Sequence, residues 1–253
     1  MKIIMNFIHR LLITFFCIIP ALFAANKPLN IGVTRFIPPF VMQGANNEKY
    51  GFDVDMMISL CKIMHRDCKF HTMQFNQLIP AILDKKVDLA VSFITITPKR
   101  SELVKFSIPY LLSYSRFLSK HSTKEIKVPF SLKSLDNQKI GVVKGTIFAE
   151  QIHKMKITNP IIKNYQALEP LLEALSKKEV DFILVDNPTA IYWEANSSGK
   201  LSVVGAPYMY GYGVGIAVNP QDKNLLASIN KALIDYNSSD DFKNNYDKYI
   251  PHL

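Results

Sequence analysis

The alternation of short apolar strands with amphipathic segments is the feature that most constrains this chain. LNIGVTRFIPPFV reads as a strand that ends in a proline-directed turn, and VDLAVSF reads as a later strand. Between them, GFDVDMMISLCKIMH and NQLIPAILDKK repeat apolar residues at helical spacing. Strands that alternate with helices at this distance predict βαβ units, and therefore an α/β fold with mostly parallel sheets.

The same alternation occurs a second time further along the chain. LDKKVDLAVSFITITP and LSKKEVDFILVDNPTA share an order of helix, Lys-Lys, acid, apolar strand, polar residue, proline and helix. This likeness of form predicts two lobes of similar construction. No low-complexity linker separates them, so we expect strands that cross between the lobes rather than a flexible tether.

The N-terminus carries the pattern of an export signal. Lys2 and Arg10 precede the uncharged run LLITFFCIIPALFA, which ends in small residues. This pattern predicts a signal peptide over residues 1–24, cleaved after Ala24. The alternative is an uncleaved anchor, but the run is shorter than the ~20 residues that a spanning helix needs. Cys17 lies inside the run rather than at its end, which argues against lipid attachment.

The charge of the chain is basic. The formal net charge of +9 falls by two, to +7, when Lys2 and Arg10 leave with the signal. Clustered Lys and Arg side chains bind nucleic acid by neutralising phosphates. Here the positive residues are interleaved with acids, and no zinc-finger spacing or basic helix is found in the sequence. We therefore interpret the charge as a solvated surface and expect no nucleic-acid partner.

Two cysteines remain after the signal, Cys61 and Cys68 in CKIMHRDC. An even pair in an oxidising compartment favours a disulfide that closes a small local loop. The alternative is a metal site that adds His65 and His71. Zinc sites usually have tighter Cys-x2-4-Cys pairs, so the disulfide is the preferred interpretation and we expect no metal.

Seven motifs together resemble a known family. In chain order they are GFDVD (51–55), LIPAI (78–82), VDLAVSFITITPKR (87–100), VKFSIPY (104–110), VVKGT (142–146), VDFILVDNP (180–188) and GYGVGIAV (211–218). The mature chain is similar over essentially its whole length to periplasmic solute-binding proteins of the polar amino acid type, the receptors of ATP-binding-cassette importers. GANNE before the first motif and the cysteine pair after it are most similar to the arginine-binding branch.

The resemblance implies a two-lobed periplasmic binding protein fold in which two crossing strands form the hinge. Lobe 1 is expected over residues 25–112 and 213–253, and lobe 2 over residues 113–212. It further implies a periplasmic, monomeric protein that binds an amino acid in the cleft and passes it to the membrane permease of an ABC importer. No cofactor is expected.

The end of the strand DLAVSF carries the first group of candidate site residues. Thr97 and Pro98 predict a helix start, with Thr97 as N-cap and Pro98 as the first helical residue. We expect free amides there to attract an anion, and Arg100 to grip a carboxylate with two hydrogen bonds. The alternative for Arg100 is a surface ion pair with Glu102 or another acid.

Hydroxyls at the carboxyl end of a strand in an open α/β sheet lie where ligands bind. By resemblance, three residues join Arg100 around the α-carboxylate of the ligand: Ser92, Phe93 and Thr95.

The second half of the chain supplies the opposite charge. Asp186 ends the strand DFILVD, and resemblance assigns it the α-ammonium of the ligand; the alternative role is to cap the helix that starts near Pro188. In KGTIF, Gly145 permits close backbone approach and Thr146 supplies a hydroxyl. Relatives often carry a second hydroxyl where Ile147 stands, so Ile147 would offer its backbone amide alone.

The side-chain pocket is predicted from resemblance. Phe75 matches an aromatic residue that stacks on the ligand side chain, and an aromatic face suits a guanidinium. A second such aromatic falls at Ile37, which has no ring to stack, so neighbouring Phe36 is the candidate in its place. Thr34 occupies a position where some lysine and ornithine binders carry an acid, which leaves no assured carboxylate for a basic side chain.

Two other functions compete with transport. The first is an enzyme, because a few relatives dehydrate cyclohexadienyl acids; however, the six histidines fall outside the motifs and no nucleophile elbow is found in the sequence. The second is a sensor domain that presents its ligand to a membrane receptor. We expect a non-enzymatic receptor for a polar or basic L-amino acid, with arginine as the first candidate.

Overall fold

The computed structural model describes residues 27–121 and 130–250. The predicted signal peptide, residues 1–24, lies outside the described residues, and so does Cys17. Among the described residues, no helix is both long enough and apolar enough to cross a membrane.

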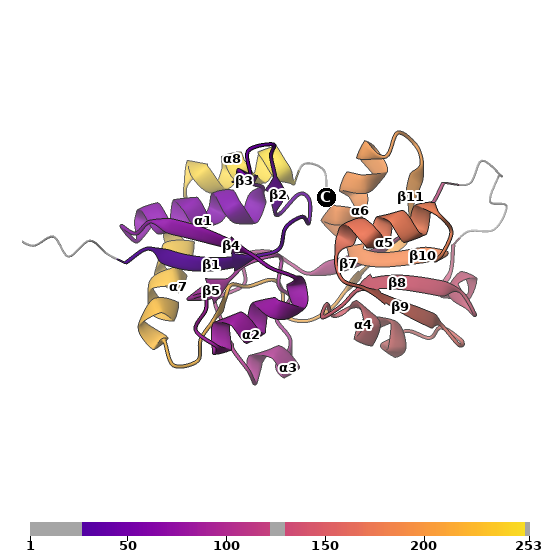
Figure 1. The fold of residues 1–253 in the computed structure, drawn as a ribbon, viewed down its shortest axis with the longest axis horizontal. Coiled ribbons are helices and arrows are strands. Elements are labelled where there is room, and N and C mark those ends of the chain that lie inside the picture. Colours follow the sequence, from indigo (N-terminus) through magenta and orange to yellow (C-terminus); the bar gives the residue numbers. More distant parts are fainter. Residues whose placement is uncertain (1–26, 122–129, 251–253) are drawn as a thin grey trace, which may run out of the picture.

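Two lobes lie side by side (Figure 1). Lobe 1 contains a five-stranded sheet in the order β4-β1-β5-β12-β6. Its elements are β1 (Leu29–Val33), β2 (Met42–Gln43), β3 (Lys49–Tyr50), α1 (Phe52–Ile63), β4 (Cys68–Thr72), a 3₁₀ turn η1 (Phe75–Gln77), α2 (Leu78–Leu83), β5 (Leu89–Ala90), α3 (Pro98–Ser101), β6 (Lys105–Phe106), β12 (Ala217–Val218), α7 (Lys223–Asn237) and α8 (Asp240–Tyr249).

Lobe 2 contains a second five-stranded sheet in the order β11-β7-β10-β8-β9. Its elements are β7 (Tyr114–Lys120), a 3₁₀ turn η2 (Leu132–Leu135), β8 (Lys139–Val143), α4 (Phe148–Lys154), β9 (Ile161–Tyr165), α5 (Leu168–Ser176), β10 (Phe182–Asp186), α6 (Asn187–Asn196) and β11 (Leu201–Met209).

Strand pairing in both sheets is mixed, which corrects the expectation of mostly parallel sheets. In lobe 1, β1 is parallel to β4 and β5, whereas β12 is antiparallel to β5 and β6. In lobe 2, β8 is parallel to β9 and β10, whereas β7 is antiparallel to β10 and β11. The antiparallel strands β7, β11 and β12 flank the crossings between the lobes. Antiparallel neighbours need no crossover helix between them, so the βαβ pattern did not reveal them.

Each sheet has helices on both faces because its central strands are apolar on both sides. Phe117 and Leu118 are neighbours in β7, yet Phe117 packs with the core under α4 and Leu118 with the core under α5 and α6. Ile183 and Leu184 in β10 divide in the same way. Successive side chains of a strand point to opposite faces, so continuous apolar runs require cover on both.

The chain crosses between the lobes twice, and the two crossings are hydrogen-bonded to each other. Tyr110 N donates to Val214 O at 2.9 Å, and Val214 N donates to Leu111 O at 2.9 Å. Further toward lobe 2, Tyr210 N donates to Ser113 O at 3.2 Å. The expected pair of crossing strands is therefore confirmed, and it joins the lobes through a short backbone ladder.

The predicted disulfide is confirmed. Cys61 in α1 and Cys68 in β4 are bonded, with Cα atoms 6.0 Å apart. No group of three or more His, Cys, Asp or Glu side chains in the described ranges could hold a metal ion. The sulfurs that a zinc site with His65 and His71 would require are bonded to one another instead.

Candidate functional site

A cavity of about 460 Å³ opens between the lobes. Of the residues predicted for the ligand site, all except Ser92 line it: Thr34, Phe36, Ile37, Phe75, Phe93, Thr95, Arg100, Thr146, Ile147 and Asp186. Segments from distant parts of the sequence thus meet at the carboxyl ends of parallel strands, as the fold class predicts.

Ser92 lies behind the cavity wall instead. Its hydroxyl accepts a hydrogen bond from Thr34 N at 2.8 Å, and the two side-chain hydroxyls are 3.1 Å apart. Ser92 is fully buried, whereas Thr34 lines the cavity. In this structure Ser92 therefore fixes the position of a lining residue and does not itself reach the cavity.

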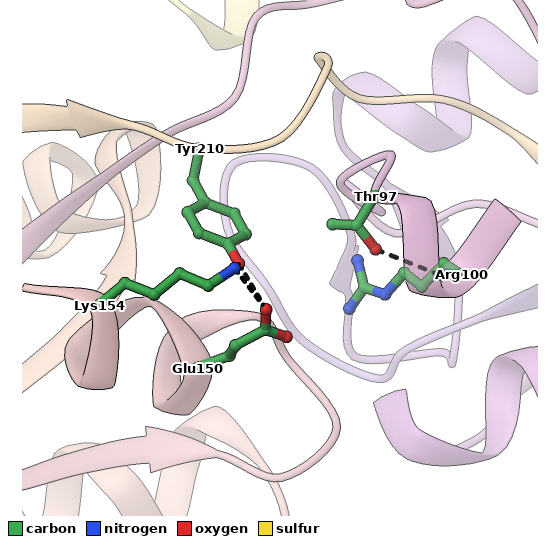
Figure 2. Close-up of polar contacts among 5 residues, drawn as sticks. All are labelled: Thr97, Arg100, Glu150, Lys154 and Tyr210. Atoms are coloured by element: carbon green, nitrogen blue, oxygen red, sulfur yellow. Dashed lines mark hydrogen bonds and ion pairs between the residues drawn. The ribbon is translucent and has the colours of Figure 1, made fainter.

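The local structure around Arg100 begins as predicted, with Thr97 as N-cap and Pro98 as the first residue of α3. The Thr97 hydroxyl accepts from Arg100 N at 3.3 Å (Figure 2). However, α3 has only four residues. So short a helix adds little dipole, and the expected attraction of an anion to free helix amides gains no support.

Arg100 is buried, with 9% of its surface exposed, so it is not a surface residue paired with Glu102. Its Nη1 donates to Thr95 O at 2.7 Å, and its Nη2 donates to Gly145 O at 3.1 Å in lobe 2. Its Cζ lies 5.3 Å from the centre of the Phe75 ring. Burial lowers the pKa of Arg100 to about 10, and the field of Asp186 opposes that shift, so the group stays cationic near neutral pH.

Asp186 lines the opposite wall and is 6% exposed. It is the N-cap residue of α6, yet its side chain makes no capping hydrogen bond, so the carboxylate is not engaged in that alternative role. Burial raises its pKa to about 8, against the lowering effect of Arg100. Arg100 and Asp186 both lie in the part of the chain that the structure describes, and they form no ion pair with each other. A cation and an acid held apart on facing walls can accommodate a zwitterion between them.

The hydroxyls of the site are held in place by hydrogen bonds. Thr95 Oγ1 and Ser113 Oγ are 3.0 Å apart, which ties the site to the first crossing strand. Thr146 Oγ1 donates to Val143 O at 2.6 Å and keeps its acceptor capacity. Gly145 has a φ of 84°, and a Cβ on it would lie 2.7 Å from Asn76 Cβ. The close approach that Gly145 permits is thus to lobe 1.

Aromatic rings surround the rest of the cavity. The Phe36 ring packs edge-on against Trp193 of α6, with centroids 6.2 Å apart. Phe93 stacks on Phe40 with centroids 3.8 Å apart. Ile37 lines the cavity without a ring, as the sequence indicates. Phe36 therefore lines the cavity and also contacts Trp193 of the other lobe.

Asp53 is a residue whose role the sequence did not reveal. Its Oδ2 accepts from Phe93 N at 2.6 Å, and its Oδ1 accepts from Tyr110 OH at 2.9 Å. Phe93 has a φ of 48°, so this bond holds an unusual backbone conformation beside the cavity. Burial raises the pKa of Asp53 to about 7. An acid within the apolar start of GFDVDMM was the only sequence signal for this role.

A second group lies across from Arg100 (Figure 2). Lys154 Nζ is 2.7 Å from Glu150 Oε1 and 3.0 Å from Tyr210 OH, which in turn donates to Glu150 Oε1 at 2.9 Å. Tyr210 belongs to the returning crossing segment, so this cluster joins that segment to α4. Because Lys154 and Glu150 are largely exposed, their ion pair contributes little stability.

Nearly all of the described chain matches a family. Residues 29–252 match the bacterial extracellular solute-binding proteins, family 3. The ABC transporter arginine-binding protein 1 of Escherichia coli is 31% identical over 234 residues, which cover 90% of this chain and 93% of that protein. The L-arginine-binding protein of Pseudomonas aeruginosa is 30% identical over 90% of each chain.

Solved structures share the fold. An arginine third transport system periplasmic binding protein from Legionella pneumophila aligns with a TM-score of 0.82 and 32% identity, covering 88% of this chain and 99% of that one. An ancestral arginine-binding protein bound to arginine aligns with a TM-score of 0.81 and 28% identity, over 89% and 99%.

An ancestral amino acid-binding protein, a precursor of cyclohexadienyl dehydratase, aligns with a TM-score of 0.78 and 25% identity, over 88% and 95%. The family match covers nearly all of the described residues, and the relatives align along nearly their whole length. The chain therefore belongs to the bacterial extracellular solute-binding proteins, family 3.

Proposed function

We propose that this chain is the extracytoplasmic substrate-binding component of an amino acid ABC importer, with L-arginine as its first candidate ligand. The observation that carries the proposal is the placement of buried Arg100 and buried Asp186 on facing walls of one interlobe cavity. The relatives named above as arginine-binding support the choice of ligand.

In the proposed complex, Arg100 binds the α-carboxylate and Asp186 binds the α-ammonium. Thr95 and Thr146 add hydroxyls, and Phe75 offers an aromatic face to the side chain. One zwitterion then bridges both lobes. A ligand shifts the balance between open and closed forms only through contacts that it makes better in the closed form, and these bridging contacts have that property.

The organisation of the mature protein is also part of the proposal. Removal of residues 1–24 would leave a periplasmic monomer, with lobe 1 formed by residues 25–112 and 213–253 and lobe 2 by residues 113–212. Its partner would be the membrane permease of the importer. N-terminal sequencing of the exported protein tests the cleavage site, and light scattering tests the monomer.

Calorimetry of the mature protein against the twenty L-amino acids tests the function. Binding of arginine, or of another polar L-amino acid, is the expected result. Mass spectrometry of the small molecule released on denaturation identifies the ligand independently. The absence of heat with all twenty amino acids would overturn the proposal.

Structural similarity to a dehydratase precursor makes an enzyme the second candidate. That neighbour is itself an amino acid-binding protein, so the similarity favours binding over turnover. Incubation with prephenate checks this directly: we expect no product, and measurable dehydration would favour the enzyme. Co-purification with a permease, rather than with a histidine kinase, would separate transport from sensing.

A further inference from the structure

The two walls of the cavity carry ionisable side chains of opposite type, bases on lobe 1 and acids on lobe 2. The lobe 1 wall, formed by lining residues between 34 and 100, contains Arg35 and Arg100 and no acid. The lobe 2 wall, formed by lining residues between 143 and 189, contains Glu169 and Asp186 and no base among the described lining residues. Arg100 and Asp186 are both buried, whereas Arg35 and Glu169 are both exposed. The acids of the described lining therefore all lie on lobe 2.

Glu169 is held at the cavity by the first turn of α5. Gln166, Ala167, Leu168 and Pro170 line the cavity beside it. Leu168 is buried in the core of lobe 2, which anchors this turn and so presents Glu169 from a fixed backbone. An acid in the first turn of a helix also stabilises the helix by its interaction with the helix dipole. The alternative role of Glu169 is therefore to stabilise α5.

The carboxylate of Glu169 is not consumed by a protein partner. Within the described ranges, Glu169 makes no ion pair, whereas Glu173 of the same helix pairs with Lys177 at 2.6 Å. With Asp186 occupied by the α-ammonium, Glu169 is the remaining carboxylate of the described lining.

We propose that Glu169 binds the cationic end of the ligand side chain and is the residue that selects arginine over neutral amino acids. This inference rests on the proposed function. Arg35 on the opposite wall would repel a ligand guanidinium, so it works against the same selectivity. A neutral side chain would gain nothing from Glu169.

Calorimetry with arginine and citrulline tests the inference, because citrulline replaces the guanidinium with a neutral group of nearly the same shape. Glu169→Gln should weaken arginine binding by about fivefold to thirtyfold, a modest factor because the site is partly exposed. Citrulline affinity should stay within about twofold. Glu173→Gln, on the same helix and outside the cavity lining, should change neither.

The competing explanation is that Arg35 and Glu169 form an ion pair between the lobes when ligand binds. Arg35→Gln distinguishes the two explanations. If Glu169 binds the guanidinium, Arg35→Gln removes a repelling charge and strengthens arginine binding. Equal losses for arginine and citrulline in both variants would overturn the inference in favour of the ion pair. Unchanged arginine affinity in Glu169→Gln would overturn it while leaving the proposed function intact, whereas no binding by the wild-type protein would overturn the function itself.

Discussion

Arg100 of α3 donates a hydrogen bond from Nη2 to the carbonyl oxygen of Gly145, 3.1 Å away in the other lobe. A second interlobe bond runs from Thr189 Oγ1 to Pro38 O at 2.8 Å. Direct contacts therefore already join the lobes in this structure. The residue proposed to bind the ligand carboxylate is also one of the residues that hold the lobes together.

Replacing Arg100 tests this double role. Arg100→Ala should weaken ligand binding by about two to three orders of magnitude, because loss of one partner of a buried charge pair costs about 3 to 5 kcal/mol. Arg100→Lys should also bind weakly, because an ammonium cannot form two parallel bonds to a carboxylate. Calorimetry measures both, with Lys99→Ala as the exposed neighbouring control. Binding within a few-fold of wild type in Arg100→Ala would contradict the assignment.

Gly145→Ala should impair closure. The new Cβ would lie 2.7 Å from Asn76 Cβ, so the lobes cannot approach as closely as they do here. Gly199→Ala is a matched control: its φ of 73° imposes similar backbone strain, but nothing lies within 4 Å of the added Cβ. Small-angle scattering with saturating ligand should show a more open Gly145→Ala protein and an unaffected Gly199→Ala protein. Equal compaction of the two variants would mean that this contact does not limit closure.

Asp186 should reduce the stability of the ligand-free protein as pH rises. Its folded-state pKa of about 8 lies above the ordinary value of 3.8, so its favourable contribution is complete below pH 3.8 and is lost as pH rises through about 8. Asp186→Asn should therefore raise the free energy of unfolding at pH 8 by on the order of 1 kcal/mol or more, while it weakens ligand binding.

Thermal melts of both proteins between pH 5 and pH 9 measure this effect, where the pH range brackets the titration of the buried carboxylate. Asp53, with a pKa of about 7, titrates in the same range, so the difference between variant and wild type is the relevant quantity. If the difference in melting temperature between variant and wild type does not change with pH, ionisation of Asp186 does not destabilise the folded protein, which would contradict the prediction.

The disulfide should stabilise lobe 1 without contributing to binding. Cys61 and Cys68 are seven positions apart and lie outside the cavity lining. In the chain-entropy model so short a loop gives at most roughly 3 kcal/mol, so Cys61→Ser should lower the melting temperature and keep its ligand affinity. Thermal melts and calorimetry check the two parts. Two free thiols in the exported wild-type protein would show that the bond does not form.

The sequence allowed the lobes, the crossings, the N-cap at Thr97 and the disulfide to be predicted, because each depends on local pattern or pairing chemistry. Arg100 was predicted from its own local motif, whereas Phe75 and Asp186, which come from segments far apart in the chain, were predicted by resemblance and not by spacing. Mixed strand pairing was missed because the antiparallel strands need no crossover helix, and β12, with two residues, also carries almost no periodic signal.

Other features depend on tertiary contacts that one sequence does not encode visibly. Ser92 has the residue type of a ligand contact, yet the fold places it behind Thr34. Glu169 reads as an ordinary first-turn acid until the lobes bring it to the cavity. Asp53 gains its role only because Phe93 and Tyr110 meet its carboxylate.

Small-angle scattering with arginine and two truncated analogues tests the central claim most directly. One analogue is agmatine, which lacks the α-carboxylate, and the other is arginine without its α-ammonium. If a single zwitterion bridges Arg100 and Asp186, arginine should compact the wild-type protein and neither analogue should do so at equal concentration. Compaction by either analogue to the extent that arginine produces would contradict the claim that both charged groups of the ligand close the lobes.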